Sequence, residues 1–344
     1  MGHIAVVGVG YWGPNLARNF MSLGAFDGVV ACDTDAERLS VVAKQLPGIH
    51  TCDDFAALLK RPEIEAVVVA TPVRTHYRLA KDALLAGKHV LVEKPMTKTS
   101  QGARELIEIA AECGLTLMVD HTFLFTGAVE KIIEVTSGPD FGDFYYIDSV
   151  RINLGLFQHD ADVVWDLAPH DLSIVNRVLK AKPKVVRAVG YSHTESGVAD
   201  MAYIHIKYGD RLNATFHVNW LSPTKVRRMI VAGSKKMILW DDLEAAEKIR
   251  VYDKGIETQT IGIEDQRRFQ VGYRIGDVWM PRIDQTEALQ KVARHFVDCC
   301  RNGTKPICSD EDGLDVVLAL EASDLSLTHD GRPAVITDKG PALI

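Results

Sequence analysis

A glycine-rich turn near the start of the chain restricts the fold more than any other feature. Gly8-Val9-Gly10-Tyr11-Trp12-Gly13 fits the pattern G-x-G-x-x-G, directly after an apolar, β-branched run and before a helical pattern from Pro14 to about Ser22. Glycines there allow a tight turn and the close approach of a pyrophosphate, whose charge faces the helix N-terminus. The pattern predicts a dinucleotide site at Gly8, Gly10, Tyr11, Trp12 and Gly13; the alternative is a turn that serves packing only.

A carboxylate after the second predicted strand indicates which dinucleotide binds. Asp33 follows the strand Val29–Cys32. A carboxylate at this position can accept hydrogen bonds from both adenine-ribose hydroxyls, but it would repel a 2′-phosphate. Asp35 adds negative charge, and no basic residue follows until Arg38. We therefore expect NAD rather than NADP, and the alternative is that Asp33 only caps the helix that begins near Ala36.

Strand-like and helical segments alternate regularly up to about residue 122. Three further strand-like runs are Glu65–Ala70, His89–Val92 and Leu115–Val119. They are apolar almost throughout, as is typical of strands covered by helices on both faces. The alternation predicts an α/β fold whose first domain, residues 1–122, is a Rossmann domain with a doubly wound parallel sheet.

The pattern changes in residues 123–344, where strand-like stretches lie close together with alternating polarity. They are Phe144–Leu154, Val185–Ser192, Met201–Tyr208, Arg211–Asn219, Arg227–Ala232 and Lys236–Trp240. This spacing predicts an α+β domain with a large, open-faced, mostly antiparallel sheet. A helix from about Asp166 to Leu179 interrupts it. Helices near Asp284–Arg301 and Asp310–Thr328 close the chain, and we expect them to pack back on the first domain.

Composition limits the classes of partner and the compartment. A chain of 344 residues with a net charge of -7 and no run of Lys or Arg indicates two domains and neither nucleic acid nor an anionic membrane as partner. The six cysteines show no C-x-x-C pair and no zinc spacing, so we expect inert buried thiols and no metal site. No basic leader or long apolar span precedes the first strand. These features predict a cytoplasmic protein.

Two short motifs lie at the ends of the predicted strands Glu65–Ala70 and His89–Val92, and they resemble those of a known family. Ala70-Thr71-Pro72 precedes His76, and Glu93-Lys94-Pro95 ends the next strand. Here, and over essentially the whole chain, the protein resembles the glucose–fructose oxidoreductase/inositol dehydrogenase (Gfo/Idh/MocA) family. Lys94 lies at a carboxyl end of a parallel strand, where such sheets bind ligands, although a surface charge is the alternative. The resemblance implies that Lys94 contacts the substrate hydroxyl and the nicotinamide ribose. The residues expected at the cofactor are Thr71, Pro72, His76, Glu93, Lys94 and His121.

A carboxylate and an imidazole four residues apart suggest proton transfer. Asp166 and His170 would project from one helix face, one turn apart. A neighbouring carboxylate orients an imidazole and raises its basicity, which suits a general base. Alternatively, Asp166 is an N-cap and the pairing is chance among twelve histidines. Pro169 between them is tolerable in a first turn but not deeper, and Asp171 points to another face and is expected to be structural.

The family resemblance implies a mechanism of hydride transfer. His170, with Asp166 beside it, would take the hydroxyl proton of a secondary alcohol, and Lys94 would stabilise the developing alkoxide. Hydride would pass to the nicotinamide.

Residues near this helix are candidates for substrate binding. They are Arg151, Asn153, Trp165 and His170, with Phe157, Gln158 and His159 on the intervening loop. The stretch Asn219–Pro223, followed by Lys225, Arg227 and Arg228, resembles a nucleotide-sugar branch whose members act on a ring carbon, often C3, of a UDP- or dTDP-hexose. Basic residues would suit a diphosphate there. Alternatively, Trp220 is core and the basic residues form a solvated strand edge.

Other functions remain open. Free polyols such as inositol are credible substrates, and an NAD-dependent glycosidase and a non-catalytic NAD-binding sensor are the other classes. Enzymes of this family commonly pair through the open sheet face. Because an apolar sheet face would otherwise be exposed, we expect a homodimer or homotetramer.

Overall fold

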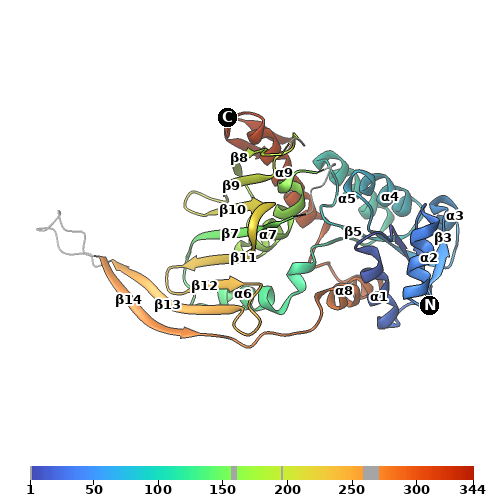
Figure 1. The fold of residues 1–344 in the computed structure, drawn as a ribbon, viewed down its shortest axis with the longest axis horizontal. Coiled ribbons are helices and arrows are strands. Elements are labelled where there is room, and N and C mark those ends of the chain that lie inside the picture. The colour runs from blue at the N-terminus through green and yellow to red at the C-terminus, as the bar shows by residue number, and fades with distance from the viewer. Residues whose placement is uncertain (1, 156–160, 195–196, 259–270) are drawn as a thin grey trace, which may run out of the picture. The chain divides into compact units, whose positions relative to one another are not determined.

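The computed structural model describes residues 2–155, 161–194, 197–258 and 271–344 (Figure 1). They form two compact units. One comprises Met1–Thr126 with Gln285–Glu321, and the other comprises Gly127–Asp284 with Ala322–Ile344. The first division thus falls a few residues after the expected position 122. The helix α8 (Ala288–Asn302) belongs to the N-terminal unit.

The N-terminal unit is a six-stranded parallel sheet with the order β3-β2-β1-β4-β5-β6. Its strands are β1 (His3–Val7), β2 (Gly28–Cys32), β3 (His50–Cys52), β4 (Ile64–Val69), β5 (His89–Glu93) and β6 (Leu117–Asp120). Its connecting helices are α1 (Gly13–Leu23), α2 (Ala36–Gln45), α3 (Phe55–Leu59), α4 (Val73–Leu85) and α5 (Ser100–Cys113), and a 3₁₀ turn, Thr122–Phe125, follows β6. Strand order reverses at β1, which creates the switch point where such sheets bind ligands. The predicted doubly wound Rossmann fold is confirmed.

The central strands of this sheet are buried on both faces, as their apolar sequences predict. Ile4–Val6 and Ala66–Val69 are fully buried, because helices on both sides exclude water from a parallel sheet. The sequence did not indicate β3, which has only three residues, none of them buried. Such a short strand carries no usable hydrophobic period.

The second unit contains a ten-stranded sheet with the order β14-β13-β12-β11-β7-β10-β9-β8-β15-β16. The six predicted strands correspond to β7 (Phe144–Leu154), β8 (Val185–Tyr191), β9 (Met201–Lys207), β10 (Asn213–Asn219), β11 (Leu221–Gly233) and β12 (Met237–Asp241). The unpredicted ones are β13 (Ile249–Thr258), β14 (Val271–Trp279), β15 (Ala334–Thr337) and β16 (Gly340–Leu343). Among the described strands of this sheet only β7 and β10 pair in parallel, so the expectation of a mostly antiparallel sheet is confirmed.

The helix α7 (Val163–Leu179) packs against β7, β9 and β10 on one face of this sheet. Alternate residues of β10, namely Ala214, Phe216 and Val218, are buried. On the same strand His217 points to the opposite face and stacks on Tyr203 at a ring distance of 4.4 Å. Tyr203 is half exposed. The sheet therefore has one core face and one mixed face that carries aromatic side chains.

The start of α7 differs from the prediction. Its N-cap is Asp162, whose Oδ1 accepts the backbone N–H groups of Val164 and Trp165, both at 2.9 Å. Asp166 therefore lies inside the first turn and is not the cap. Pro169 lies in the second turn, deeper than we expected a proline to be tolerated, within a helix that continues to Leu179.

Other expectations concern thiols and membranes. All six cysteines are free. They are not all buried, because Cys113 is exposed at the end of α5. Burial raises the pKa of the Cys32 thiol to about 12. No helix in the described ranges is long and apolar enough to cross a bilayer.

Candidate functional site

A cavity of about 560 Å³ lies at the carboxyl ends of β1, β2 and β4 in the N-terminal unit. It is lined by residues that the sequence predicted for the dinucleotide, namely Gly8, Gly10, Tyr11, Trp12, Asp33, Thr71 and Pro72. Arg38, Arg74 and Arg78 also line it. The structure therefore brings the predicted glycine turn, the acidic residue and the A-T-P motif to one cavity.

The shape of the turn requires glycine at positions 8 and 13. Gly8 has a φ of +89°, and a Cβ there would lie 2.7 Å from the Ala70 carbonyl oxygen. A Cβ on Gly13 would collide with the Gly8 carbonyl oxygen. A Cβ on Gly10 would meet only the Arg38 guanidinium, at 3.6 Å. Within the described residues no side chain caps α1, so the cradle and the helix N-terminus fit a pyrophosphate.

Asp33 is tied to this turn and does not cap α2. Its Oδ2 accepts the Val9 N–H at 2.9 Å, and its Oδ1 accepts the Asp35 N–H at 3.0 Å. The cap is Asp35, which accepts the N–H groups of Glu37 and Arg38. The alternative interpretation, that Asp33 only caps α2, is therefore wrong. Each of its oxygens keeps a second lone pair for a ribose hydroxyl.

His76 connects the two motifs that follow β4 and β5. Its Nε2 lies 2.7 Å from the Thr71 carbonyl oxygen and its Nδ1 lies 3.0 Å from the Pro95 carbonyl oxygen. The ring is only 1% exposed, and burial lowers its pKa. It therefore positions the two turns, of which the second contains the cis peptide bond Lys94–Pro95.

The ends of β5 and β6 gather buried polar groups beside Lys94. The Lys94 N–H donates to Glu93 Oε2 at 3.2 Å. Burial, with a contribution from Lys94, lowers the pKa of His121 to about 3, so the imidazole is neutral. Neither His121 ring nitrogen has a partner among the described residues. Buried polar atoms need partners, and these nitrogens fit the amide of a nicotinamide.

Asp120 was not a sequence candidate, although it pairs in register with Glu93. Its place at the carboxyl end of a parallel strand, directly before His121, was the available signal. Among the described residues no group of three or more His, Cys, Asp or Glu side chains is arranged to hold a metal.

In the second unit, Asp166 is held by a buried tryptophan. The Trp220 indole N–H donates to Asp166 Oδ2 at 3.1 Å. Trp220 is fully buried, and a Cβ on Gly155 would lie 2.6 Å from its Cδ1. The reading of Trp220 as a core residue is therefore correct. His170 is half-buried on the next turn of α7.

Two expected substrate contacts lie in the interior instead. Arg151 donates to both oxygens of Asp171, from Nε at 3.0 Å and from Nη2 at 2.7 Å, and both residues are buried. The Trp165 indole N–H donates to Asp324 Oδ2 at 2.8 Å. These polar groups are engaged by carboxylates, so their placement does not support direct substrate binding. Asp171 is structural, as expected. Asn153 is half-buried on β7, and Phe157, Gln158 and His159 lie outside the described residues.

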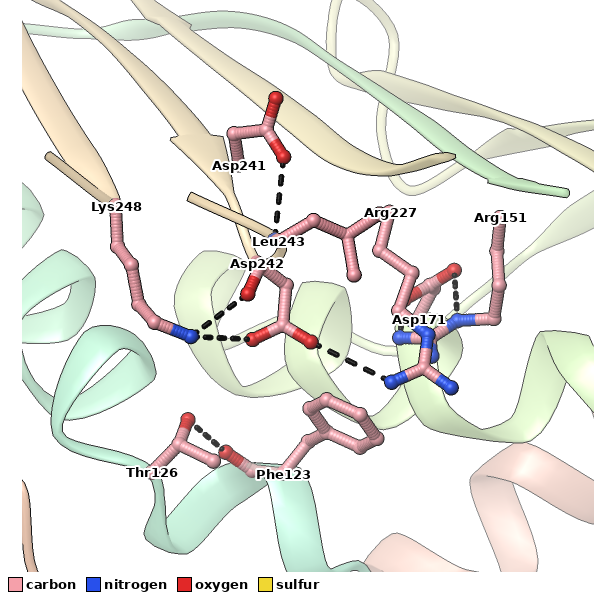
Figure 2. Close-up of polar contacts among 9 residues, drawn as sticks. All are labelled: Phe123, Thr126, Arg151, Asp171, Arg227, Asp241, Asp242, Leu243 and Lys248. Atoms are coloured by element: carbon pink, nitrogen blue, oxygen red, sulfur yellow. Dashed lines mark hydrogen bonds and ion pairs between the residues drawn. The ribbon is translucent and has the colours of Figure 1, made fainter. Parts of the chain in front are cut away.

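Arg227 and Arg228 of β11 are paired with aspartates, and Figure 2 shows the pair of Arg227 with Asp242. Asp242 lies between Lys248 and Arg227, with Nζ and Nη1 at 3.4 and 3.5 Å from its oxygens. Arg228 pairs with Asp241 at 2.8 Å. Burial, with the nearby charge of Arg151, lowers the pKa of Arg227. Arg227 is therefore neither a solvated edge residue nor an open anion site.

Comparison with known proteins gives the family. A model of an oxidoreductase family with an NAD-binding Rossmann fold matches residues 3–121. A model of the GFO/IDH/MocA C-terminal domain matches residues 154–239. The chain belongs to the Gfo/Idh/MocA family of oxidoreductases. This family assignment and the cradle described above make NAD the cofactor.

Individual relatives act on sugars. The chain is 31% identical to a UDP-N-acetylglucosamine 3-dehydrogenase of Acidithiobacillus ferrooxidans over 74% of its own length and 77% of the relative. The crystal structure of that enzyme superposes with a TM-score of 0.78 over 95% of this chain and 98% of the other, at 25% identity. A dTDP-3,4-didehydro-2,6-dideoxy-alpha-D-glucose 3-reductase of Streptomyces violaceoruber is 28% identical over 44% of this chain and 46% of its own.

We expect Asp33→Ala to weaken NADH binding about tenfold or more, because hydrogen bonds to a charged group contribute roughly 1.5–3 kcal/mol. Isothermal titration calorimetry measures this affinity. Asp35→Ala is the matched control, since it removes the same charge and the α2 cap but should leave NADH affinity within a few fold. Equal losses in both variants would contradict the role of Asp33.

Proposed function

We propose that this oxidoreductase transfers hydride between NAD and a secondary hydroxyl or ketone of a nucleotide sugar, at C3 of a UDP- or dTDP-hexose. The similarity to a UDP-N-acetylglucosamine 3-dehydrogenase over three quarters of both chains carries this proposal. The dTDP-sugar 3-reductase supports the same ring carbon with a different nucleotide.

The chain supplies the groups for the proton and the charge. When bound, NAD would accept or donate the hydride. Lys94, the residue that follows β5, would stabilise the developing alkoxide. His170 would take the hydroxyl proton. Asp166 would orient His170, and Trp220 in turn holds the Asp166 carboxylate.

The cofactor-binding residues follow from the cavity. The backbone of Gly8, Gly10, Tyr11, Trp12 and Gly13 would hold the pyrophosphate, and Asp33 the adenine ribose. Thr71, Pro72, Glu93 and His121 would bind along the nicotinamide half, with His76 behind them.

We also propose a homodimer or homotetramer in the cytoplasm, formed through the sheet face opposite α7. Exposed Tyr191 and Tyr203 on β8 and β9 support it, because large exposed apolar patches mark protein–protein interfaces.

The substrate class is tested with NAD, the enzyme freed of bound cofactor, and a panel of UDP- and dTDP-hexoses, their uronic acids and free polyols. Reduction of NAD is followed at its near-ultraviolet absorbance. We expect turnover on nucleotide sugars only. Turnover on inositol or a free sugar would replace this substrate class with a polyol. No turnover with NAD still bound would favour a glycosidase, tested on glycosides, or a sensor.

Lys94→Ala should lower kcat by about 10²–10³-fold, because one donor to a developing oxyanion is lost. NADH affinity, measured by fluorescence titration, should stay within a few fold of the wild type. Loss of NADH binding with residual turnover intact would contradict the role of Lys94.

Trp220→Phe removes the N–H that holds Asp166 and retains the aromatic ring. Since this bond ends on a carboxylate, we expect kcat/KM to fall about tenfold, with NADH affinity unchanged. Trp165→Phe is the matched control, because it removes a buried indole N–H on α7 that is bonded to Asp324. Equal losses of kcat/KM in both variants would indicate general destabilisation of α7.

A further inference from the structure

Two carboxyl groups lie side by side at the carboxyl ends of β5 and β6. Glu93 and Asp120 are register partners on these parallel strands, so their side chains leave the same face of the sheet, on strands about 4.8 Å apart. Glu93 is 7% exposed and Asp120 is 1% exposed. The two carboxyl groups therefore lie on neighbouring strands at the same buried edge of the sheet.

Each carboxyl has one oxygen with a donor and one without. Glu93 Oε2 accepts the Lys94 N–H at 3.2 Å, and Asp120 Oδ1 accepts the Thr122 hydroxyl at 2.8 Å. No donor in the described structure reaches Glu93 Oε1 or Asp120 Oδ2. Ionised carboxylates only accept hydrogen bonds, so two of them cannot satisfy each other. One proton shared by the two carboxyl groups would let one of them donate a hydrogen bond to the other.

The surrounding charges favour that proton. Burial and the charge of Asp120 raise the pKa of Glu93 well above its usual range, and burial also raises the pKa of Asp120. Lys94 opposes both shifts without cancelling them. Among the described residues, Lys94 is the cation that acts on both carboxyl groups. His121 is neutral, and Asp312, on the segment that meets β6 through Ser309, is bonded to Ser309 at 2.8 Å.

We propose that Glu93 and Asp120 share one proton at neutral pH and act as a positioning pair for Lys94. The pair carries one negative charge beside the positive charge of Lys94, and Glu93 holds the Lys94 backbone N–H. Its effect on catalysis is exerted through Lys94 and rests on the proposed function. The shared proton itself depends on neither the substrate nor the reaction.

Infrared spectroscopy of the intact protein tests the proton directly. A protonated carboxyl has a carbonyl stretch that is resolved from that of a carboxylate and shifts in D₂O. We expect this band in the wild type at neutral pH and its loss in both Glu93→Gln and Asp120→Asn. Glu112→Gln, at an exposed position on α5, should leave it unchanged. Absence of the band in the wild type, or its survival in both amide variants, would overturn the proposal.

The shared proton should also make the free energy of unfolding depend on pH. A carboxyl whose pKa is raised on folding binds its proton in the native state, so its contribution to stability is lost as pH rises above the unfolded value of about 4.3. Wild-type protein should therefore lose unfolding free energy relative to Glu93→Gln from about pH 5 upward. Parallel urea-unfolding curves at every pH would contradict the shared proton.

The effect of the carboxyl pair on Lys94 is measured separately, by the pH dependence of kcat/KM. The double variant Glu93→Gln, Asp120→Asn keeps amide hydrogen bonds but carries no charge at the pair. The alkaline limb of the kcat/KM profile, which we assign to deprotonation of Lys94, should move down by about 1–3 pH units, because a nearby anion favours the charged form of a lysine. Either single variant keeps the net charge of the pair and should restore the wild-type limb. If the infrared band is present in the wild type but the alkaline limb does not move in the double variant, the shared proton stands and its action on Lys94 is refuted.

Discussion

The parallel pairing of β1, β4, β5 and β6 is the constraint on which the candidate site depends. Parallel strands end at one edge of a sheet, so segments distant in sequence come together there. Gly8 follows β1, Thr71 follows β4, Lys94 follows β5 and His121 follows β6. Buried His76 then fixes the turn after β4 to the turn after β5 through two carbonyl groups.

At this edge of the sheet, burial as well as direct contacts determines which side chains are charged. Asp33 is held by two backbone N–H groups and faces the cofactor cavity. At the other end Lys94 stands next to two buried carboxyls and a neutral histidine. Low dielectric makes each of these charges costly unless it is compensated. Sharing of one proton by Glu93 and Asp120 reduces that cost and leaves a single anion for a single cation.

In the second unit, buried hydrogen-bond donors likewise hold carboxylates in place. Trp220, fully buried, provides one indole N–H to the Asp166 carboxylate, and Asp171 takes both arms of the Arg151 guanidinium. A buried guanidinium with a bidentate partner is a structural element, because removing either member leaves an uncompensated charge. The residues that remain candidates for chemistry are therefore those held by this framework, Asp166 and His170.

The sequence by itself determined the Rossmann domain, the glycine cradle, Asp33, the E-K-P motif and the mixed second sheet, because each follows from a local period or a short motif. It missed β3 and β13 to β16, which are short or lack a clear period. Only the tertiary structure decided that Asp35 caps α2, that Arg151 and Trp165 are interior residues, and that Asp120 meets Glu93. These outcomes depend on which side chains packing brings together across neighbouring strands and helices, and no local pattern encodes that.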